Sequence, residues 1–164
     1  MKSQIRVVMM GMLCALAVAP SAARAEDDNV YDGKTYPGSL CDAASDLQSY
    51  AKTAPFYYNS APAGATVFCP IVQDSWQNNA GLTYSRMSIF NNVAGQTFTC
   101  TENSYNVYGS FIGSRSFSTT TQGTSIQYFF NGSYLNTTSD GYMMIQCTLP
   151  QYGRIWNYLV QEKA

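Results

Sequence analysis

The 164-residue chain contains no histidine, which removes the usual partner of most catalytic nucleophiles. Histidine is the commonest general base, the partner of serine and cysteine nucleophiles, and the commonest metal ligand. Acid–base chemistry would then fall to carboxylates, and glycoside hydrolysis is a reaction that two facing carboxylates can perform. Beyond the N-terminal segment, the acidic residues available for such a pair include Asp42, Asp46, Asp74, Glu102, Asp140 and Glu162.

Glu102 is the acidic residue whose position is most informative, because it has the same parity along its segment as Phe98 and Cys100. It either points inward near a strand end or turns outward where the strand ends. The outward position is favoured, since lone acids are seldom fully buried. Paired with Asp74 or Asp140, an accessible Glu102 would make the chain a carboxylate-dependent hydrolase.

A second kind of chemistry is sugar binding. The chain holds 13 Tyr and 2 Trp residues, many neutral polar residues and only 12% charged residues. Tyr and Trp combine an apolar ring face with a polar tip, which suits the faces and hydroxyls of sugars. Trp76, Tyr105 and Tyr108 lie in or near predicted loops and form the candidate ligand-binding set. The competing interpretation is that the tyrosines are half-buried strand residues, which β-propensity alone favours.

Charge and cysteine spacing exclude several partners. Removal of a leader would leave six basic against ten acidic residues, a formal charge of −4. Such a chain has no electrostatic footprint for nucleic acid. No two cysteines lie two to four residues apart, so neither a zinc site nor a cofactor is predicted. Three scattered arginines would either bind an anionic ligand or stay solvated: Arg86, Arg115 and Arg154.

Residues 1–25 are typical of a secretory signal peptide, with a positive start, an apolar run over residues 7–19 and an Ala-Arg-Ala cleavage site. The apolar run is shorter than the roughly 20 residues that cross a bilayer. We therefore expect a secreted or periplasmic protein with no membrane span after processing. Residues 26–38 are predicted to be a polar N-terminal tail, and residues 39–164 a single domain.

Hydrophobic alternation predicts that this domain is almost entirely β. Val67, Cys69 and Ile71 share one face, while Pro70 between them favours an edge strand or a bulge. A short helix is expected over residues 42–52, where apolar residues recur at helical spacing. Strands are expected within residues 56–58, 66–74, 82–91, 97–108, 114–122, 124–135, 141–149 and 154–162.

The segment 124–135 alternates regularly, which places Ile126, Tyr128 and Phe130 together on one face. The Ser/Thr-rich segment 114–122 is predicted to be a solvated edge strand or hairpin. Many short strands, turn residues between them and little helix indicate an all-β fold. The predicted fold class is an antiparallel β-sandwich, jelly-roll-like, with two disulfides.

Four cysteines remain after the leader, and an even number in an exported chain indicates two disulfides. Four cysteines allow three pairings. Cys100 and Cys147 each lie on the apolar face of a strand, so a bridge between them is favoured. Cys69 also faces inward and Cys41 precedes it, so the second predicted bridge is Cys41 with Cys69.

Several motifs follow one another in a distinctive order along the mature chain. They are Cys41, Asn59-Ser60-Ala61, Val67-Phe68-Cys69-Pro70-Ile71, Cys100, Cys147-Thr148-Leu149-Pro150 and the aromatic segment from Trp156 to Glu162. This order resembles that of small secreted bacterial proteins of unknown function, which have a Cys-Pro strand and a closing Cys-x-Leu-Pro motif. The resemblance implies an exported β fold and transfers no functional residue.

Three functions from different classes remain. The first is an exported, non-catalytic β-sandwich with a structural or binding role, whose partner would be a glycan or another cell-surface protein. The second is a carbohydrate-binding module that uses Trp76, Tyr105 and Tyr108. The third is the carboxylate-dependent hydrolase that would use Glu102.

Overall fold

The structure is a computed structural model that describes residues 31–45, 50–53, 55–61, 63–73, 81–138 and 140–163. The predicted signal peptide, Asp74 and Trp76 lie outside these residues. The elements in chain order are β1 (Tyr31–Pro37), the 3-10 helix η1 (Gly38–Leu40), β2 (Asp42–Ala43), β3 (Tyr50–Thr53), β4 (Phe56–Asn59), β5 (Ala65–Ile71), β6 (Gly81–Asn91), β7 (Phe98–Tyr105), β8 (Phe111–Thr119), β9 (Gly123–Asn136), β10 (Tyr142–Leu149) and β11 (Arg154–Lys163).

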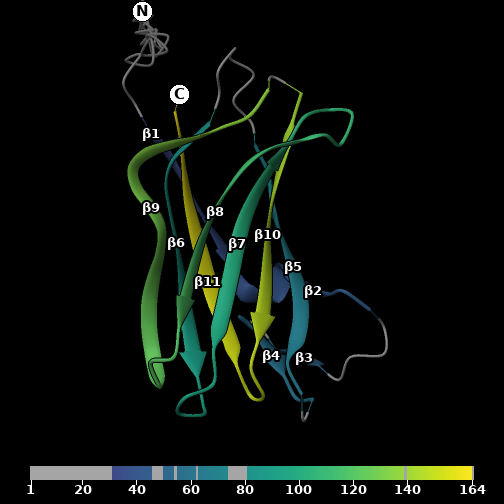
Figure 1. Ribbon diagram of the computed structural model, residues 1–164, viewed down its shortest axis with the longest axis vertical. Coiled ribbons are helices and arrows are strands. Elements are labelled where there is room, and N and C mark those ends of the chain that lie inside the picture. The colour runs from purple at the N-terminus through teal and green to yellow at the C-terminus, as the bar shows by residue number, and fades with distance from the viewer. Residues whose placement is uncertain are drawn as a thin grey trace, which may run out of the picture.

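Two antiparallel sheets pack face to face, which confirms the predicted β-sandwich (Figure 1). One sheet, called the β11 sheet here, has the order β3-β4-β11-β6-β9, and β1 also pairs with β11. The other, the β10 sheet, has the order β2-β5-β10-β7-β8. From β5 onward, the chain changes sheet at every connection except β7–β8. Residues distant in sequence are therefore neighbours throughout the domain.

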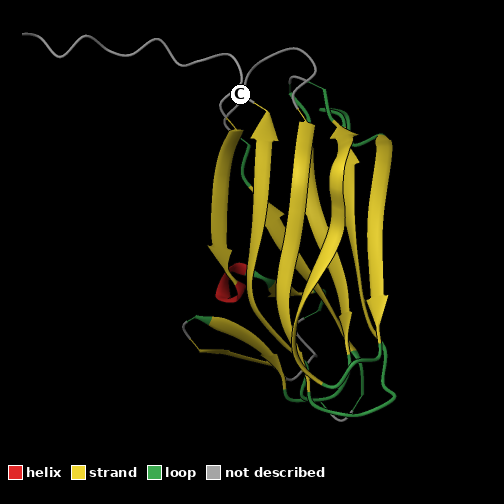
Figure 2. Cartoon of the chain, turned by 90° about the vertical axis from the view of Figure 1, so that its left-hand side faces the viewer, coloured by secondary structure: helices red, strands yellow, loops and turns green. Residues whose placement is uncertain are grey.

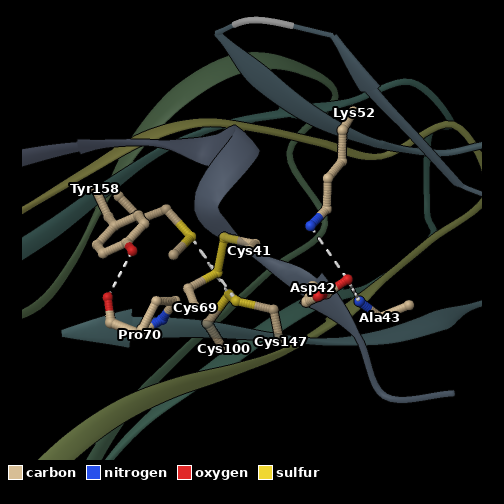
Figure 3. Close-up of a disulfide and its surroundings, with 10 residues drawn as sticks. Cys41, Asp42, Ala43, Lys52, Cys69, Pro70, Cys100, Cys147 and Tyr158 are labelled. Carbon is tan, nitrogen blue, oxygen red and sulfur yellow. Dashed lines mark hydrogen bonds and ion pairs between the residues drawn. A yellow bond between two sulfur atoms is a disulfide. The ribbon is translucent and has the colours of Figure 1, made fainter.

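The core lies between the sheets and is built from the side chains that point inward at every second residue of the strands. In β5, Val67 and Cys69 are fully buried and Ile71 is 6% exposed, as the alternation predicted, and Ala65 is buried on the same face. Across the core, Tyr158 of β11 donates a hydrogen bond of 2.6 Å to the backbone carbonyl of Pro70 (Figure 3). Burial raises the pKa of the Tyr158 hydroxyl, which keeps it a donor in this bond between the two sheets.

Strands β8 and β9 are the end strands of the two sheets. They contact each other on the side of the sandwich that faces the viewer in Figure 2. The contact is aromatic: the rings of Phe117 in β8 and Phe129 in β9 meet edge to face, with centroids 4.9 Å apart. Phe117 also stacks on Phe98, at 6.5 Å. These rings close the core along one side of the sandwich.

Three local predictions were wrong, and in each case strand pairing explains the difference. Residues 31–37 of the expected polar tail form β1, whose backbone pairs with residues 157–163 of β11. The expected helix over residues 42–52 is replaced at its ends by β2 and β3, because Asp42 pairs with Phe68 and residues 50–53 pair with β4. A weak helical pattern gives way to these tertiary contacts.

The third difference lies in β9, where Ile126 and Tyr128 do not share a face with Phe130. Ile126 and Tyr128 are 48% and 49% exposed, whereas Phe130 is buried. Arg86 pairs with Tyr128 and Ser85 pairs with Phe130, so Phe129 is an extra residue in β9. A β-bulge of this kind reverses the parity of the residues that follow it.

Both predicted disulfides are present: Cys41 is bonded to Cys69, and Cys100 to Cys147 (Figure 3). All four cysteines are fully buried. The Met87 sulfur lies 3.6 Å from the Cys100 sulfur and 3.8 Å from the Cys147 sulfur. Because Met87 belongs to β6 in the opposite sheet, the second disulfide packs directly against the facing layer.

We expect loss of either disulfide to destabilise the domain strongly. The bonded cysteines are 28 and 47 residues apart, so each bridge should contribute about 3 to 4 kcal/mol by restricting the unfolded chain. The double variants Cys41→Ala/Cys69→Ala and Cys100→Ala/Cys147→Ala should each lower the melting temperature by about 10 °C or more. Thermal melts with and without reductant provide the measurement, and a wild-type melt that reductant leaves unchanged would contradict it.

Candidate functional site

Three aromatic rings form a cluster on the outer face of the β10 sheet, at the end where β7 stops and β10 starts. The rings of Tyr105 and Tyr142 are stacked, with centroids 5.1 Å apart and planes 18° apart. Phe111 of β8 meets Tyr105 edge to face, at 6.0 Å. Phe111 and Tyr142 are 60% and 46% exposed. We call Tyr105, Phe111 and Tyr142 the aromatic platform.

Strand register brings the platform together. Tyr142 pairs directly with Tyr105, and Tyr105 pairs with Phe111 on the other side. Cys147 pairs with Cys100 in the same β7–β10 ladder, so the disulfide holds that ladder in register. Directly opposed residues in an antiparallel pair point to the same face. This disulfide, on the inner face of the sheet, therefore also sets the two tyrosines beside each other on the outer face.

Gly141 allows β10 to begin this close to β7. A Cβ atom at residue 141 would lie 2.5 Å from the backbone oxygen of Tyr105 and would also collide with the Thr137 hydroxyl. Real side chains do not tolerate such contacts, so glycine is needed for this approach. The residue that follows, Tyr142, is thereby placed beside Tyr105.

The turn between β7 and β8 borders the platform and carries Tyr108, which is 89% exposed. The side-chain oxygen of Asn106 accepts hydrogen bonds from the backbone N–H groups of Tyr108 and Ser110, at 2.9 and 2.8 Å. Gly109 in this turn has φ +77°, a conformation that favours glycine. The turn is thus fixed by its own hydrogen bonds while its tyrosine ring faces solvent.

The structure brings together part of the ligand-binding set that the sequence suggested. Tyr105 lies at the centre of the platform and Tyr108 in the adjoining turn, whereas Trp76 lies outside the described residues. Phe111 and Tyr142 were not among the candidates. The sequence feature that could have identified them is that each begins a strand after a polar turn. Only the strand order shows that both residues neighbour Tyr105.

A second aromatic group lies on the outer face of the β11 sheet, around Arg154. Its guanidinium carbon is 5.4, 5.1 and 5.2 Å from the ring centroids of Phe56, Tyr58 and Phe90. Trp156 packs edge to face on Phe56, at 4.7 Å. Tyr58 and Phe90 pair with Arg154 from the strands on either side. Cation–π attraction holds this arginine against its neighbours.

The other two arginines that the sequence singled out do not belong to this aromatic group. Arg115 is exposed, and its Nη1 donates to the backbone oxygen of Ser114 at 3.0 Å. Arg86 is half-buried in the middle of β6, near the pair of rings formed by Tyr84 and Tyr128. The three arginines are therefore separate features of the surface.

Replacement of Arg154 should cost stability. Arg154→Leu removes the charge above three rings and should lower the free energy of unfolding by about 1 to 2 kcal/mol. Arg154→Lys should lose less than Arg154→Leu, because it keeps the charge but not the planar stacking group. Urea unfolding curves measure both, with Arg115→Leu as the exposed control. Equal losses for the Arg154→Leu and Arg115→Leu variants would contradict the expectation.

Glu102 points inward and is fully buried, contrary to the favoured expectation that it turns outward. It follows Phe98 and Cys100 into the core because β7 continues to Tyr105, so the strand does not end at residue 102. The Ser85 hydroxyl donates a 3.1 Å hydrogen bond to Oε1, while Oε2 has no hydrogen-bond partner. Burial raises the pKa of Glu102 to about 8, and the bond from Ser85 offsets only part of that effect.

The raised pKa predicts that stability falls as pH rises. The unfolded chain releases the Glu102 proton near pH 4.5, whereas the folded chain keeps it up to about pH 8. Between those values the unfolded state binds fewer protons, so the free energy of unfolding should drop by about 1.4 kcal/mol per pH unit. This contribution is complete below pH 4.5 and is lost above pH 8.

Glu102→Gln should remove this slope, because the amide stays neutral at every pH. Urea unfolding at pH 5, 6.5 and 8 measures the difference, and the variant should become more stable than wild type at pH 8. Asp140→Asn, which changes an exposed acid, should retain the wild-type slope. A Glu102→Gln variant with the wild-type slope would show that Glu102 titrates normally.

Glu102 does not suit the hydrolase interpretation. A catalytic carboxyl group must reach its substrate, and Glu102 has no exposed surface, whereas Asp140 is exposed. Asp74, the other suggested partner, lies outside the described residues. Glu162 is also buried, and its Oε1 pairs with Lys34 Nζ at 3.1 Å. Within the described ranges, no group of three or more acidic or cysteine residues is placed to hold a metal ion.

No protein-family model and no curated protein matches this chain. Solved structures similar to it include a family 6 carbohydrate-binding module, with 14% identity, TM-score 0.47 and coverage of 77% of this chain and 92% of that one. Another is the CBM36-1 domain of a multidomain xylanase from the hindgut metagenome of Trinervitermes trinervoides, with 10% identity, TM-score 0.46 and coverage of 81% and 98%. A third is the C-terminal CBM6 of LamC, a marine laminarinase from Zobellia galactanivorans, with 10% identity, TM-score 0.43 and coverage of 79% and 99%. All three TM-scores are below 0.5, so these likenesses say nothing of what this chain binds.

Proposed function

We propose that this protein is an exported carbohydrate-binding module, and that the aromatic platform with Tyr108 is its sugar-binding surface. The stacked pair of the half-buried Tyr105 and the exposed Tyr142 is the single observation that carries the proposal. A sugar ring has an apolar face of C–H groups and a rim of hydroxyls. Tyrosine rings match both, because the ring covers the apolar face and the phenol bonds to a hydroxyl.

The surroundings of the platform favour a sugar over a protein partner. A protein–protein interface usually has large side chains and few charges at its core, and a polar, solvent-accessible rim where charged side chains are found. Here the outward neighbours on β7, β8 and β10 are Asn103, Ser114 and Met144, which have no charge. Neutral hydrogen-bonding groups beside rigid rings suit a ligand whose polar groups are hydroxyls.

Binding, rather than catalysis, fits the position of the acidic groups. Glu102, the acid in the strand that carries Tyr105, is fully buried, so it cannot act on a ligand at the surface. Export to the periplasm or the cell exterior, predicted from the leader, would bring the platform to polysaccharides. Two buried disulfides are consistent with an oxidising compartment.

Loss of a platform ring should weaken sugar binding without unfolding the domain. Affinity electrophoresis in gels that contain xylan, mannan, β-glucan or polygalacturonate tests retention by each polysaccharide. Tyr142→Ala and Tyr105→Ala should each weaken binding to the retained polysaccharide by tenfold or more, because each removes one of two stacked rings. Tyr142→Phe should weaken it less, since it keeps the ring and loses only the hydroxyl.

Tyr128→Ala is the matched control. Tyr128 is 49% exposed, close to the 46% of Tyr142, but lies on the outer face of the β11 sheet. The control should bind like wild type, and all variants should keep the wild-type melting temperature within a few degrees. A Tyr142→Ala variant that binds every polysaccharide as well as wild type would overturn the platform as the site.

A further inference from the structure

The outer face of the β10 sheet is uncharged along three neighbouring strands, from the platform to the opposite end. Strand register identifies the residues that point outward with Tyr105, Phe111 and Tyr142. On β7 they are Thr99, Thr101 and Asn103, on β8 Ser114, Ser116 and Ser118, and on β10 Met144, Gln146 and Thr148. We call these nine residues the neutral strip.

Four of the nine residues of the neutral strip are open to solvent. Ser116, Ser118, Gln146 and Thr148 are exposed, and eight of its nine residues carry a hydroxyl or amide group. The charged residues closest to it in sequence do not interrupt it. Arg115 lies opposite the inward-facing Glu102 in the β7–β8 ladder, and its exposed guanidinium donates to the backbone oxygen of Ser114. Asp140 precedes the start of β10.

A shallow hollow of about 260 Å³ lies at the far end of the neutral strip. Its walls come from the segments just before β5 and β7 and just after β10, with Thr148 at the end of β10. It is lined by Ala63, Gly64, Gln96, Thr97, Thr148, Leu149, Pro150 and Gln151. These residues include two amide side chains and two hydroxyls and no charged group.

We propose that the ligand is an uncharged, linear polysaccharide that lies along β7 and β10, with one end on the aromatic platform and the other in the hollow. This inference rests on the proposed function. From Tyr142 to Thr148 the strand rises by about 20 Å, which is the reach of about four or five linked sugar rings. The platform would hold one ring by stacking, and the strip and hollow would bind the hydroxyls of the following rings.

The lack of charge defines the class of ligand. A polysaccharide with carboxylates or sulfates would lose hydration along the strip without meeting a cation, which disfavours its binding. A neutral chain replaces water with side-chain hydroxyls and amides of the same hydrogen-bonding capacity. The strip thus selects neutral over acidic chains, while the platform alone would accept either.

Isothermal titration with a length series of the retained polysaccharide, from the disaccharide to the octasaccharide, tests the inference. Affinity should rise at least tenfold between two and five units and then level off. The Gln96→Ala/Gln151→Ala variant should bind the disaccharide like wild type but lose most of the gain at five units. Asn157→Ala, an exposed amide on the β11 sheet, is the control and should change neither.

The outcomes separate this inference from the proposed function. Affinity that is equal from two to eight units, or a Gln96→Ala/Gln151→Ala variant with the wild-type length dependence, would overturn the extended site but leave the platform in place. Polygalacturonate that binds as tightly as a neutral chain would overturn the uncharged class. Failure of all the polysaccharides to bind would overturn the proposed function itself, and this inference with it.

Discussion

The register between β7 and β10 is the constraint on which the candidate site depends. Cys100 and Cys147 lie opposite each other in this ladder, and their disulfide prevents the two strands from sliding. Tyr105 and Tyr142 occupy another opposed pair of the same ladder, on the other face. A shift by one residue would turn one tyrosine into the core and break the stack. The covalent bond inside the sandwich therefore preserves an arrangement of rings outside it.

The two faces of the β10 sheet have opposite chemistry. Its inner face carries the disulfides and the apolar core, together with Glu102, a buried acid whose pKa is raised by its burial. Along β7, β8 and β10 its outer face is neutral and mostly polar and ends in the aromatic platform. Burying Glu102 with one carboxyl oxygen unpartnered costs stability. The hydrogen bond from Ser85, in the facing sheet, offsets part of that cost.

Local alternation was sufficient for most of the fold and for the disulfides. Cys69, Cys100 and Cys147 each share a strand face with apolar residues, so their burial followed from a period of two. The pairing followed from that burial and from Cys41 being the remaining cysteine, which precedes Cys69. The same rule failed at Phe130, because the bulge at Phe129 adds a residue that no local pattern shows. At Glu102 the alternation rule correctly indicated an inward side chain. The outward position was nevertheless predicted, because lone acids are seldom fully buried.

The sequence by itself determined an all-β domain with two specific disulfides, because side-chain parity within a strand depends only on neighbouring residues. It also marked Tyr105 and Tyr108 as candidates, from their type and their place near a turn. Only the tertiary structure decided which rings meet. Phe111 and Tyr142 reach Tyr105 through strand order, and Tyr142 comes from a strand that begins 37 residues after Tyr105. Such pairing depends on the packing of the whole chain, which no local pattern encodes.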